Sequence, residues 1–219
     1  MKIVAFVPIK LNNERLPGKN TIPFDNGEPL ISYILKTLKK VDSIDSIYTY
    51  CSSTDIIPYL LEGINFIKRD AYLDLPTTSF NEVLTSFADI IEADIYVLAH
   101  ATAPFLSVKS ISEAIEKVRS GRYDSALAVV KQQEFMWKDG RPFNYDVENI
   151  PRTQDLEPFY FETCGLYVYT KEIIHNKKRR IGDRPYLLEV SKIEAFDINT
   201  ADDFIIANAI FNSVFRGES

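Results

Sequence analysis

The sequence has few of the residues and patterns that define several large classes of protein. Its two cysteines, Cys51 and Cys164, lie far apart and form no metal-binding pair, which is typical of a reduced, cytoplasmic protein. No apolar run is long enough for a membrane span, and the first run, 3–9, is also too short for a signal peptide. The formal net charge of -6 argues against nucleic acid as the main partner, because phosphate-backbone binders cluster lysine and arginine.

Two nucleotide-binding patterns are also missing. Neither the Walker pattern nor the dinucleotide pattern GxGxxG occurs, so a kinase and a dehydrogenase lose their main support. The one basic cluster, 177–180, is short, and we predict that it forms a solvated stretch of surface, with contact to a substrate or partner as the alternative.

What the sequence contains is a regular alternation of apolar runs and segments with helical periodicity. Strands are predicted at 3–9, 44–51, 64–67, 95–99, 125–130, 166–169 and 192–196. Helices are predicted at 30–41, at 80–91, at 108–118 with Ser107 as its N-cap, and after Thr200, the last with Phe204, Ala207, Phe211 and Val214 on one face. This order predicts an α/β fold in which residues 1–219 form one domain around a single open, mostly parallel twisted sheet with helices on both faces.

Residues 131–163 interrupt this alternation. They are polar and aromatic and have no clear helical period, so we predict an irregular arm, which could be a hairpin, a lid or a dimer contact. Ligands of open α/β sheets bind beyond the carboxyl ends of the strands, which selects the loops after Ile9, after Ala99 and after the later strands as the site.

The loop after the first strand carries three cations, Lys10, Arg15 and Lys19, within ten residues. Gly18 lets the backbone approach a ligand closely, and Pro17 fixes the turn before it. Backbone N–H groups in such a turn, together with lysine and arginine, suit the phosphates of a nucleoside triphosphate.

The segment Arg15-Leu16-Pro17-Gly18-Lys19 resembles the signature loop of the acylneuraminate and 3-deoxy-manno-octulosonate cytidylyltransferases, the CMP-sugar synthetases. Similar motifs follow in the family's order along nearly the whole chain, among them Asn26-Gly27-Glu28-Pro29-Leu30-Ile31. The resemblance implies a Rossmann-like nucleotidyltransferase fold, transfer of CMP from CTP to an acidic sugar with release of pyrophosphate, a Mg²⁺ cofactor and a homodimer.

The resemblance also implies which residues meet each substrate. CTP would be bound by the catalytic cations Lys10, Arg15 and Lys19 and by Pro8, Asn12, Asn13, Gly18, Asn20, Arg69 and Thr77. The acceptor would be contacted by His100, Thr102, Arg152, Gln154 and Tyr167, with Arg184 and Lys131 as further candidates on charge and placement alone. A purely structural role stays open for two of these residues. His100 could bond only to the backbone at its strand end, and Tyr167 could be a core residue with one hydrogen bond.

Residues 197–200 resemble the Asp-Ile-Asp-Thr element that holds the magnesium ion in this family. A period of two puts the side chains of Asp197 and Asn199 on one side of the strand end, so both can reach one ion. Asn199 stands where the family has its second Asp, which leaves Asp197 as the main metal ligand. Asp203 is better explained as the capping-box partner of Thr200.

Three departures from the family pattern leave other functions open. Glu14, Leu106 and Asn199 each remove a charge or ligand that the family uses. The acceptor could therefore be another keto-sugar acid or a phosphonate, and a uridylyl- or guanylyltransferase of sugar 1-phosphates stays possible within the fold. From a different class, the chain could be a nucleotide- or sugar-binding protein that has lost catalysis.

Overall fold

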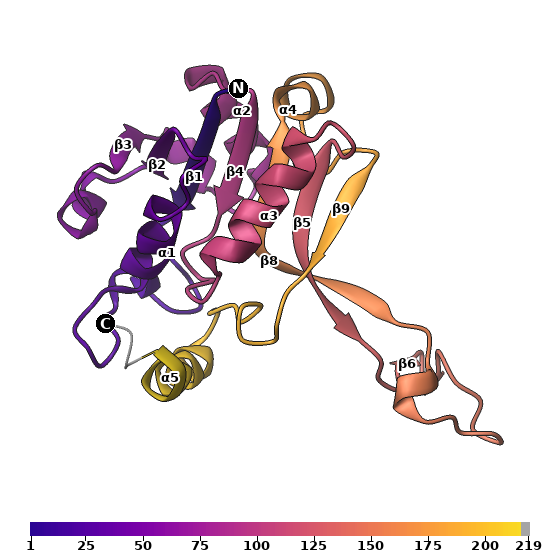
Figure 1. Ribbon diagram of the computed structural model, residues 1–219. Helices are drawn as coiled ribbons and strands as arrows, with labels where there is room; N and C mark the ends of the chain where they lie inside the picture. The colour runs from indigo at the N-terminus through magenta and orange to yellow at the C-terminus, as the bar shows by residue number, and fades with distance from the viewer. Residues whose placement is uncertain (216–219) are drawn as a thin grey trace.

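A seven-stranded sheet with the strand order β3-β2-β1-β4-β8-β5-β9 forms the centre of the computed structural model, which describes residues 1–215 (Figure 1). Its strands are β1 (Ile3–Ile9), β2 (Ser46–Cys51), β3 (Asn65–Lys68), β4 (Ile95–Ala99), β5 (Ser125–Gln132), β8 (Phe159–Thr170) and β9 (Pro185–Glu189). All neighbouring strands pair in parallel except β8, which runs antiparallel to both β4 and β5. The predicted open, mostly parallel sheet is therefore confirmed, and residues 216–219 of the expected domain lie outside the described part.

Helices cover both faces of the sheet, as the sequence predicted. The five α-helices are α1 (Leu30–Lys39), α2 (Phe80–Ile90), α3 (Val108–Arg119), α4 (Lys171–Lys177) and α5 (Ala201–Ile210). Apolar residues of α1 and α3 pack on one face, and those of α2 and α4 pack on the other. β1 is buried on both faces at every position but Pro8, which explains its continuous apolar run. Among residues 1–215, no helix has the length and apolar character needed to cross a membrane.

Helix caps follow the predicted residues. The Ser107 hydroxyl accepts a hydrogen bond from the backbone N–H of Ser110 at the start of α3. Thr200 and Asp203 form a complete capping box at the start of α5, which gives Asp203 the structural role expected of it. α5 then passes into a π-helical turn, Phe211–Phe215. This wider turn takes Val214 off the predicted apolar face, and its side chain is 48% exposed.

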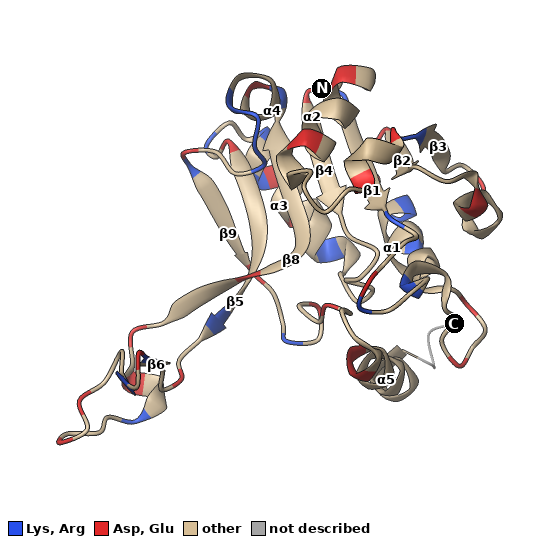
Figure 2. Cartoon of the chain, turned by 180° about the vertical axis from the view of Figure 1, so that it is seen from behind, with Lys and Arg blue, Asp and Glu red and all other residues tan. Residues whose placement is uncertain are grey.

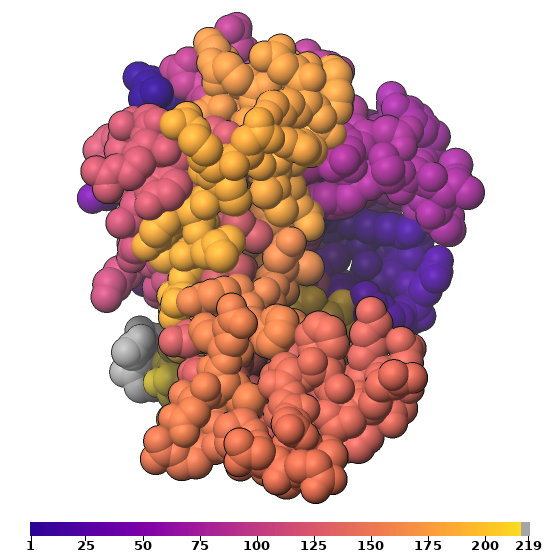
Figure 3. All heavy atoms as spheres, turned by 90° about the vertical axis from the view of Figure 1, so that its right-hand side faces the viewer, coloured from indigo at the N-terminus to yellow at the C-terminus, as the bar shows by residue number. Residues whose placement is uncertain are grey.

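The irregular segment 131–163 forms an arm that projects from the body (Figure 1). Its base is a ribbon in which the end of β5 pairs with the start of β8, for example Lys131 with Tyr160. Its tip carries a two-stranded sheet of β6 (Trp137–Lys138) and β7 (Arg141–Pro142). The space-filling view shows the surface hollowed between the indigo N-terminal segment and the orange residues of β8 (Figure 3).

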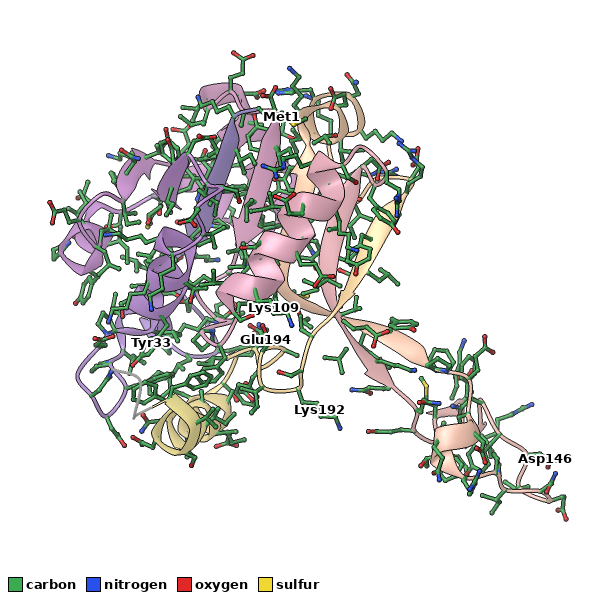
Figure 4. The ribbon with its side chains drawn as sticks, in the orientation of Figure 1. Met1, Tyr33, Lys109, Asp146, Lys192 and Glu194 are labelled. Atoms are coloured by element: carbon green, nitrogen blue, oxygen red, sulfur yellow. The ribbon has the colours of Figure 1, made fainter. Side chains whose placement is uncertain are left out.

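One predicted strand is wrong, because residues 192–196 form a turn. The Ala195 amide bonds to the Ser191 carbonyl, and the Glu194 carboxylate accepts from the Ser107 amide (2.9 Å) and the Ser110 hydroxyl (2.8 Å). Glu194 thereby places a negative charge at the positive N-terminal end of α3, close to Lys109 (Figure 4). The edge strand is β9 instead, which the sequence analysis missed along with the short helix α4.

Candidate active site

The site lies at the carboxyl ends of β1 and β4, where the middle of β8 passes beside them at Cys164. A cavity of about 440 Å³ there is lined by Pro8, Asn13, Arg15, Lys19, Asn20, His100, Ala101, Thr102, Cys164, Asp197 and Asn199. A second cavity of about 270 Å³ is lined by Pro8, Lys10, Arg69, Leu73, Asp74, Leu75, Pro76, Thr78, Phe80, Val83 and His100. Pro8 and His100 line both, so the two cavities adjoin. We call the first the phosphate cavity and the second the nucleoside cavity, after the parts of CTP that we propose for them below.

Most of the predicted site residues line these cavities. Asn12, Gly18 and Thr77 do not, and Asn12 and Thr77 are exposed. A larger cavity of about 590 Å³, between α2 and the end of α4, contains none of the predicted site residues. Charges of both signs are spread over the body and the arm, so the cationic first loop does not belong to a general basic face (Figure 2).

Buried polar atoms without a partner concentrate at the two cavities. Among the described residues, five buried side-chain atoms make no hydrogen bond, and three of them are Asn13 Oδ1, Arg69 Nε and His100 Nε2. Each of these three residues lines one or both cavities. Leaving a buried polar atom unpaired costs about 1–3 kcal/mol, so a ligand that bonds to these atoms would be stabilised there.

Lys19 is held at the floor of the phosphate cavity. Gly18 adopts a left-handed conformation (φ 68°) before the short 3-10 turn Lys19–Thr21, which turns the loop inward. The ammonium group donates to the backbone carbonyl of Ile198 at 2.8 Å. Burial lowers the pKa of Lys19, and Arg15 lowers it further, while Asp197 opposes the shift. The cation is thus partly stripped of water and close to a carboxylate.

Arg15, Asn199 and Asp197 form a hydrogen-bonded chain across the phosphate cavity. The Arg15 guanidinium donates to Asn199 Oδ1 at 2.7 Å, and Asn199 Nδ2 donates to Asp197 Oδ2 at 2.6 Å. The sequence placed these residues far apart, in the first loop and before the last helix. The fold joins them through Ile198, whose amide donates to the Thr102 carbonyl (2.9 Å) and whose carbonyl accepts from the Lys19 ammonium of the first loop (2.8 Å).

The oxygens of Asp197 and Asn199 suit a magnesium ion that is bound together with phosphates. Mg²⁺ is usually held by one or two carboxylates, substrate phosphates and water, and Asp197 supplies one carboxylate at this cavity. The described residues contain no group of three or more His, Cys, Asp or Glu side chains that could hold a metal by themselves. The donor set therefore fits an ion that arrives with the nucleotide.

Arg69 is the buried cation of the nucleoside cavity. Its side chain is 4% exposed, pairs with Asp74, and donates to the Ile9 carbonyl at 2.9 Å. Asp74 in turn accepts from the hydroxyl of Ser52. The guanidinium also lies 5.6 Å from the centre of the Tyr50 ring. These contacts fix the end of β1 against the segment that precedes α2.

His100 stands between the two cavities as a neutral imidazole. Burial lowers the pKa of His100 to about 4, and the nearby charges of Arg180 and Lys19 contribute. Its ring lies 5.4 Å from the ring of Phe80. At neutral pH it can therefore offer a ligand one donor and one acceptor without adding charge.

The other predicted acceptor contacts are arranged differently. Thr102 lines the phosphate cavity, whereas Arg152 and Gln154 lie on the arm, where Arg152 pairs with Asp155 at 2.7 Å. Tyr167 is buried, and its hydroxyl donates to Glu162 at 2.6 Å. Neither Tyr167 nor the arm residues line the cavities.

The two further acceptor candidates also lie outside the cavities. Lys131 is exposed at the base of the arm, and Arg184 precedes β9 at the opposite edge of the sheet, next to Asp124. Leu106 is buried in the core, so its difference from the family pattern does not alter the cavity surface.

The sequence analysis missed two residues at the site. Cys164 lines the phosphate cavity in a left-handed conformation (φ 58°), beside the register shift between β5 and β8. Arg180 reaches Tyr167 and Phe80 from the loop after α4. No local signal marks either residue, because both are brought there by the antiparallel course of β8 and the return of the chain to β9.

Comparison with known proteins finds similar sequences along nearly the whole chain. The chain is 25% identical to the N-acylneuraminate cytidylyltransferase of Streptococcus agalactiae serotype V over 99% of its own length and 55% of that protein. It thus spans about half the length of the neuraminate relatives that it matches. It is 24% identical to the CMP-N,N'-diacetyllegionaminic acid synthase of Legionella pneumophila, over 96% of each protein.

A solved structure of CMP:2-keto-3-deoxy-manno-octonic acid synthetase complexed with CTP shares the fold, with a TM-score of 0.71 at 13% identity. The alignment covers 97% of this chain and 99% of that one. Residues 4–191 match the family model described as Cytidylyltransferase, and the chain therefore belongs to the Cytidylyltransferase family.

Proposed function

We propose that this chain transfers CMP from CTP to an acidic sugar and releases pyrophosphate. One observation carries the proposal: the first-loop cations Arg15 and Lys19 share one cavity with the carboxylate of Asp197. A cavity with two cations and one metal-binding carboxylate suits a triphosphate with its metal ion. The similarity to N-acylneuraminate cytidylyltransferase and to CMP-N,N'-diacetyllegionaminic acid synthase supports an acidic sugar as the acceptor.

The reaction follows from the charges of the site. A hydroxyl oxygen of the acceptor forms a bond to the α-phosphorus of CTP, the bond to the bridging oxygen breaks, and pyrophosphate and the hydroxyl proton are released. Negative charge accumulates on the leaving phosphates, where Arg15 and Lys19 stabilise it. Lys10 and Arg69 line the adjoining cavity and would hold the nucleoside side of CTP. Positioning of both substrates supplies much of the remaining acceleration.

Mg²⁺, held by Asp197, would neutralise phosphate charge when it is bound. The hydrogen bond that Arg15 donates to Asn199 gives Asn199 a second role, because it orients Arg15 toward the same cavity. The neutral amide thus links the metal-binding side of the cavity to the cationic loop.

We also propose a homodimer that forms through the arm. Apolar side chains on the arm are unusually exposed, with Trp137 62%, Phe143 52% and Ile150 63% accessible. Exposed apolar patches of this kind mark protein–protein contacts. An arm that packs on a second copy would place Arg152 and Gln154 at the dimer interface, so their predicted roles would operate between subunits.

A nucleotide-binding protein without turnover is the second candidate. It is favoured by the fact that the Asn199 amide is already bonded to both Arg15 and Asp197. Pyrophosphate release separates the two candidates, measured with Mg²⁺ for each common nucleoside triphosphate against a panel of keto-sugar acids and a phosphonate. Release with CTP and one sugar acid supports the transferase, whereas CTP binding with no release from any pair supports the binding protein.

A further inference from the structure

Arg180 is a stacked arginine beside the active site that the proposed reaction does not yet use. It follows α4 in the basic segment drawn blue in Figure 2. The guanidinium carbon lies 3.7 Å from the centre of the Tyr167 ring and 5.2 Å from that of Phe80. Nη2 also donates to the Tyr167 hydroxyl at 3.0 Å. Arg180 is thus an ordered residue, contrary to the solvated surface that the sequence analysis expected for 177–180.

Arg180 lines neither cavity itself, and these contacts place its charge against Phe80, a residue of the nucleoside cavity. Phe80 lines the nucleoside cavity and packs on His100, which lines both cavities. The positive charge of Arg180 also lowers the pKa of His100, in the same direction as burial. Arg180 approaches from β8 and α4, whereas the first-loop cations approach from β1, so the two sets of cations border different sides of the site.

Most of the guanidinium remains available to a ligand. An arginine has five N–H donors, and among residues 1–215 Arg180 makes a single hydrogen bond, to Tyr167. Glu162 forms a long ion pair with Arg180 at 4.0 Å, and its carboxylate also accepts a hydrogen bond from the Tyr167 hydroxyl. The Arg180 side chain is 23% exposed, so a ligand would find it partly desolvated and already held in place by stacking.

We propose that Arg180 binds the carboxylate of the acidic acceptor sugar. The proposal rests on the proposed function and names the residue that selects acidic acceptors. A planar guanidinium matches a carboxylate with two parallel hydrogen bonds, and its aromatic support lowers the entropy lost on binding. The nucleotide phosphates have their own cations in Arg15 and Lys19, on the other side of the site. Tyr167 is then a positioning residue, which orients Arg180 rather than touching the sugar.

The test compares Arg180→Met with Arg179→Met, the adjacent arginine, whose guanidinium bonds to Asp183 at 2.5 Å instead of the aromatic rings. Pyrophosphate release is measured with N-acetylneuraminate, 3-deoxy-manno-octulosonate and a legionaminate, varying acceptor and CTP separately. Arg180→Met should raise the acceptor KM by about 10- to 100-fold with little change in the KM for CTP. Arg180→Lys keeps the charge but loses the planar fork, so its acceptor KM should lie between those of the wild type and Arg180→Met. The acceptor KM of Arg179→Met should match that of the wild type.

A second arm needs no variant and no turnover. The wild type is saturated with a non-hydrolysable CTP analogue and titrated with acceptor at equilibrium. The C1 amide of the acceptor should bind at least about tenfold more weakly than the acid. Equal affinity for acid and amide, or an unchanged acceptor KM in Arg180→Met, would overturn the assignment. If acid binding depends on Arg180 but no acceptor is turned over, the assignment holds and the proposed transfer fails. If none of the acids binds to the wild type, the assignment fails as well.

Discussion

His100 should make the stability of this protein fall in mild acid, by an amount that the structure allows us to estimate. The pKa of the imidazole falls from 6.5 in the unfolded chain to about 4 in the folded protein, mainly through burial. Above the unfolded value both states are neutral and His100 has no effect on stability. As pH falls from the unfolded toward the folded pKa, only the unfolded chain takes up a proton, and stability is lost. Between about pH 7.5 and about pH 5 the loss amounts to about 2 kcal/mol.

The assay is urea denaturation followed by circular dichroism at both pH values, for the wild type and for His100→Gln. The variant should lack the loss of stability that His100 causes. On acidification, the free energy of unfolding of the wild type should therefore fall by about 2 kcal/mol more than that of the variant. His175→Gln is the matched control, because it removes the chain's other histidine from an exposed position on α4. Parallel pH profiles for wild type and His100→Gln, or an NMR titration of His100 centred near its ordinary pKa, would refute the reasoning.

Further predictions concern the other side chains of the site. Lys19→Met should lower kcat/KM for CTP by about 100-fold, because it removes a preorganised cation from the leaving phosphates; steady-state kinetics check this, and an unchanged value would exclude the role. Asp197→Asn should raise the Mg²⁺ concentration for half-maximal rate by about tenfold or more, measured by titrating the metal at saturating CTP. Arg69→Met should lower the free energy of unfolding by about 3 kcal/mol, because it leaves the carboxylate of Asp74 without its cation in a nearly buried position. Adding Asp74→Asn to that variant should recover part of the loss, and purely additive effects would contradict a coupled pair.

The sequence predicted the elements in which the order of apolar and polar residues follows the burial of the side chains. β1 is an unbroken apolar run because helices cover both of its faces. β9 was missed because it is a short edge strand that begins at Pro185, and its apolar residues do not follow a burial pattern: only Leu188 is buried, whereas Leu187 is 41% exposed. The apolar residues of 192–196 suggested a strand, but Glu194 binds the start of α3 and the backbone turns. The antiparallel direction of β8 is a matter of chain topology that no local pattern encodes.

The same distinction applies to the active site. The cations of the first loop could be predicted because they are neighbours in the sequence and follow a buried strand. The chain from Arg15 through Asn199 to Asp197 joins opposite ends of the sequence, and the resemblance alone brought the last two to the site. Arg180 could not be predicted, because its place depends on how the loop after α4 returns to β9 and on stacking against Tyr167.

The most direct test of the proposed reaction follows the α-phosphorus of CTP. The protein is incubated with Mg²⁺, CTP labelled at the α-phosphorus and the panel of sugar acids, and the products are separated by charge and mass. The proposed transfer predicts that the label appears in a CMP conjugate of one acid, in equal amount to the pyrophosphate released and only when that acid is present. Label that stays in CTP with every acid, or that appears as free CMP whether or not an acid is added, would contradict it.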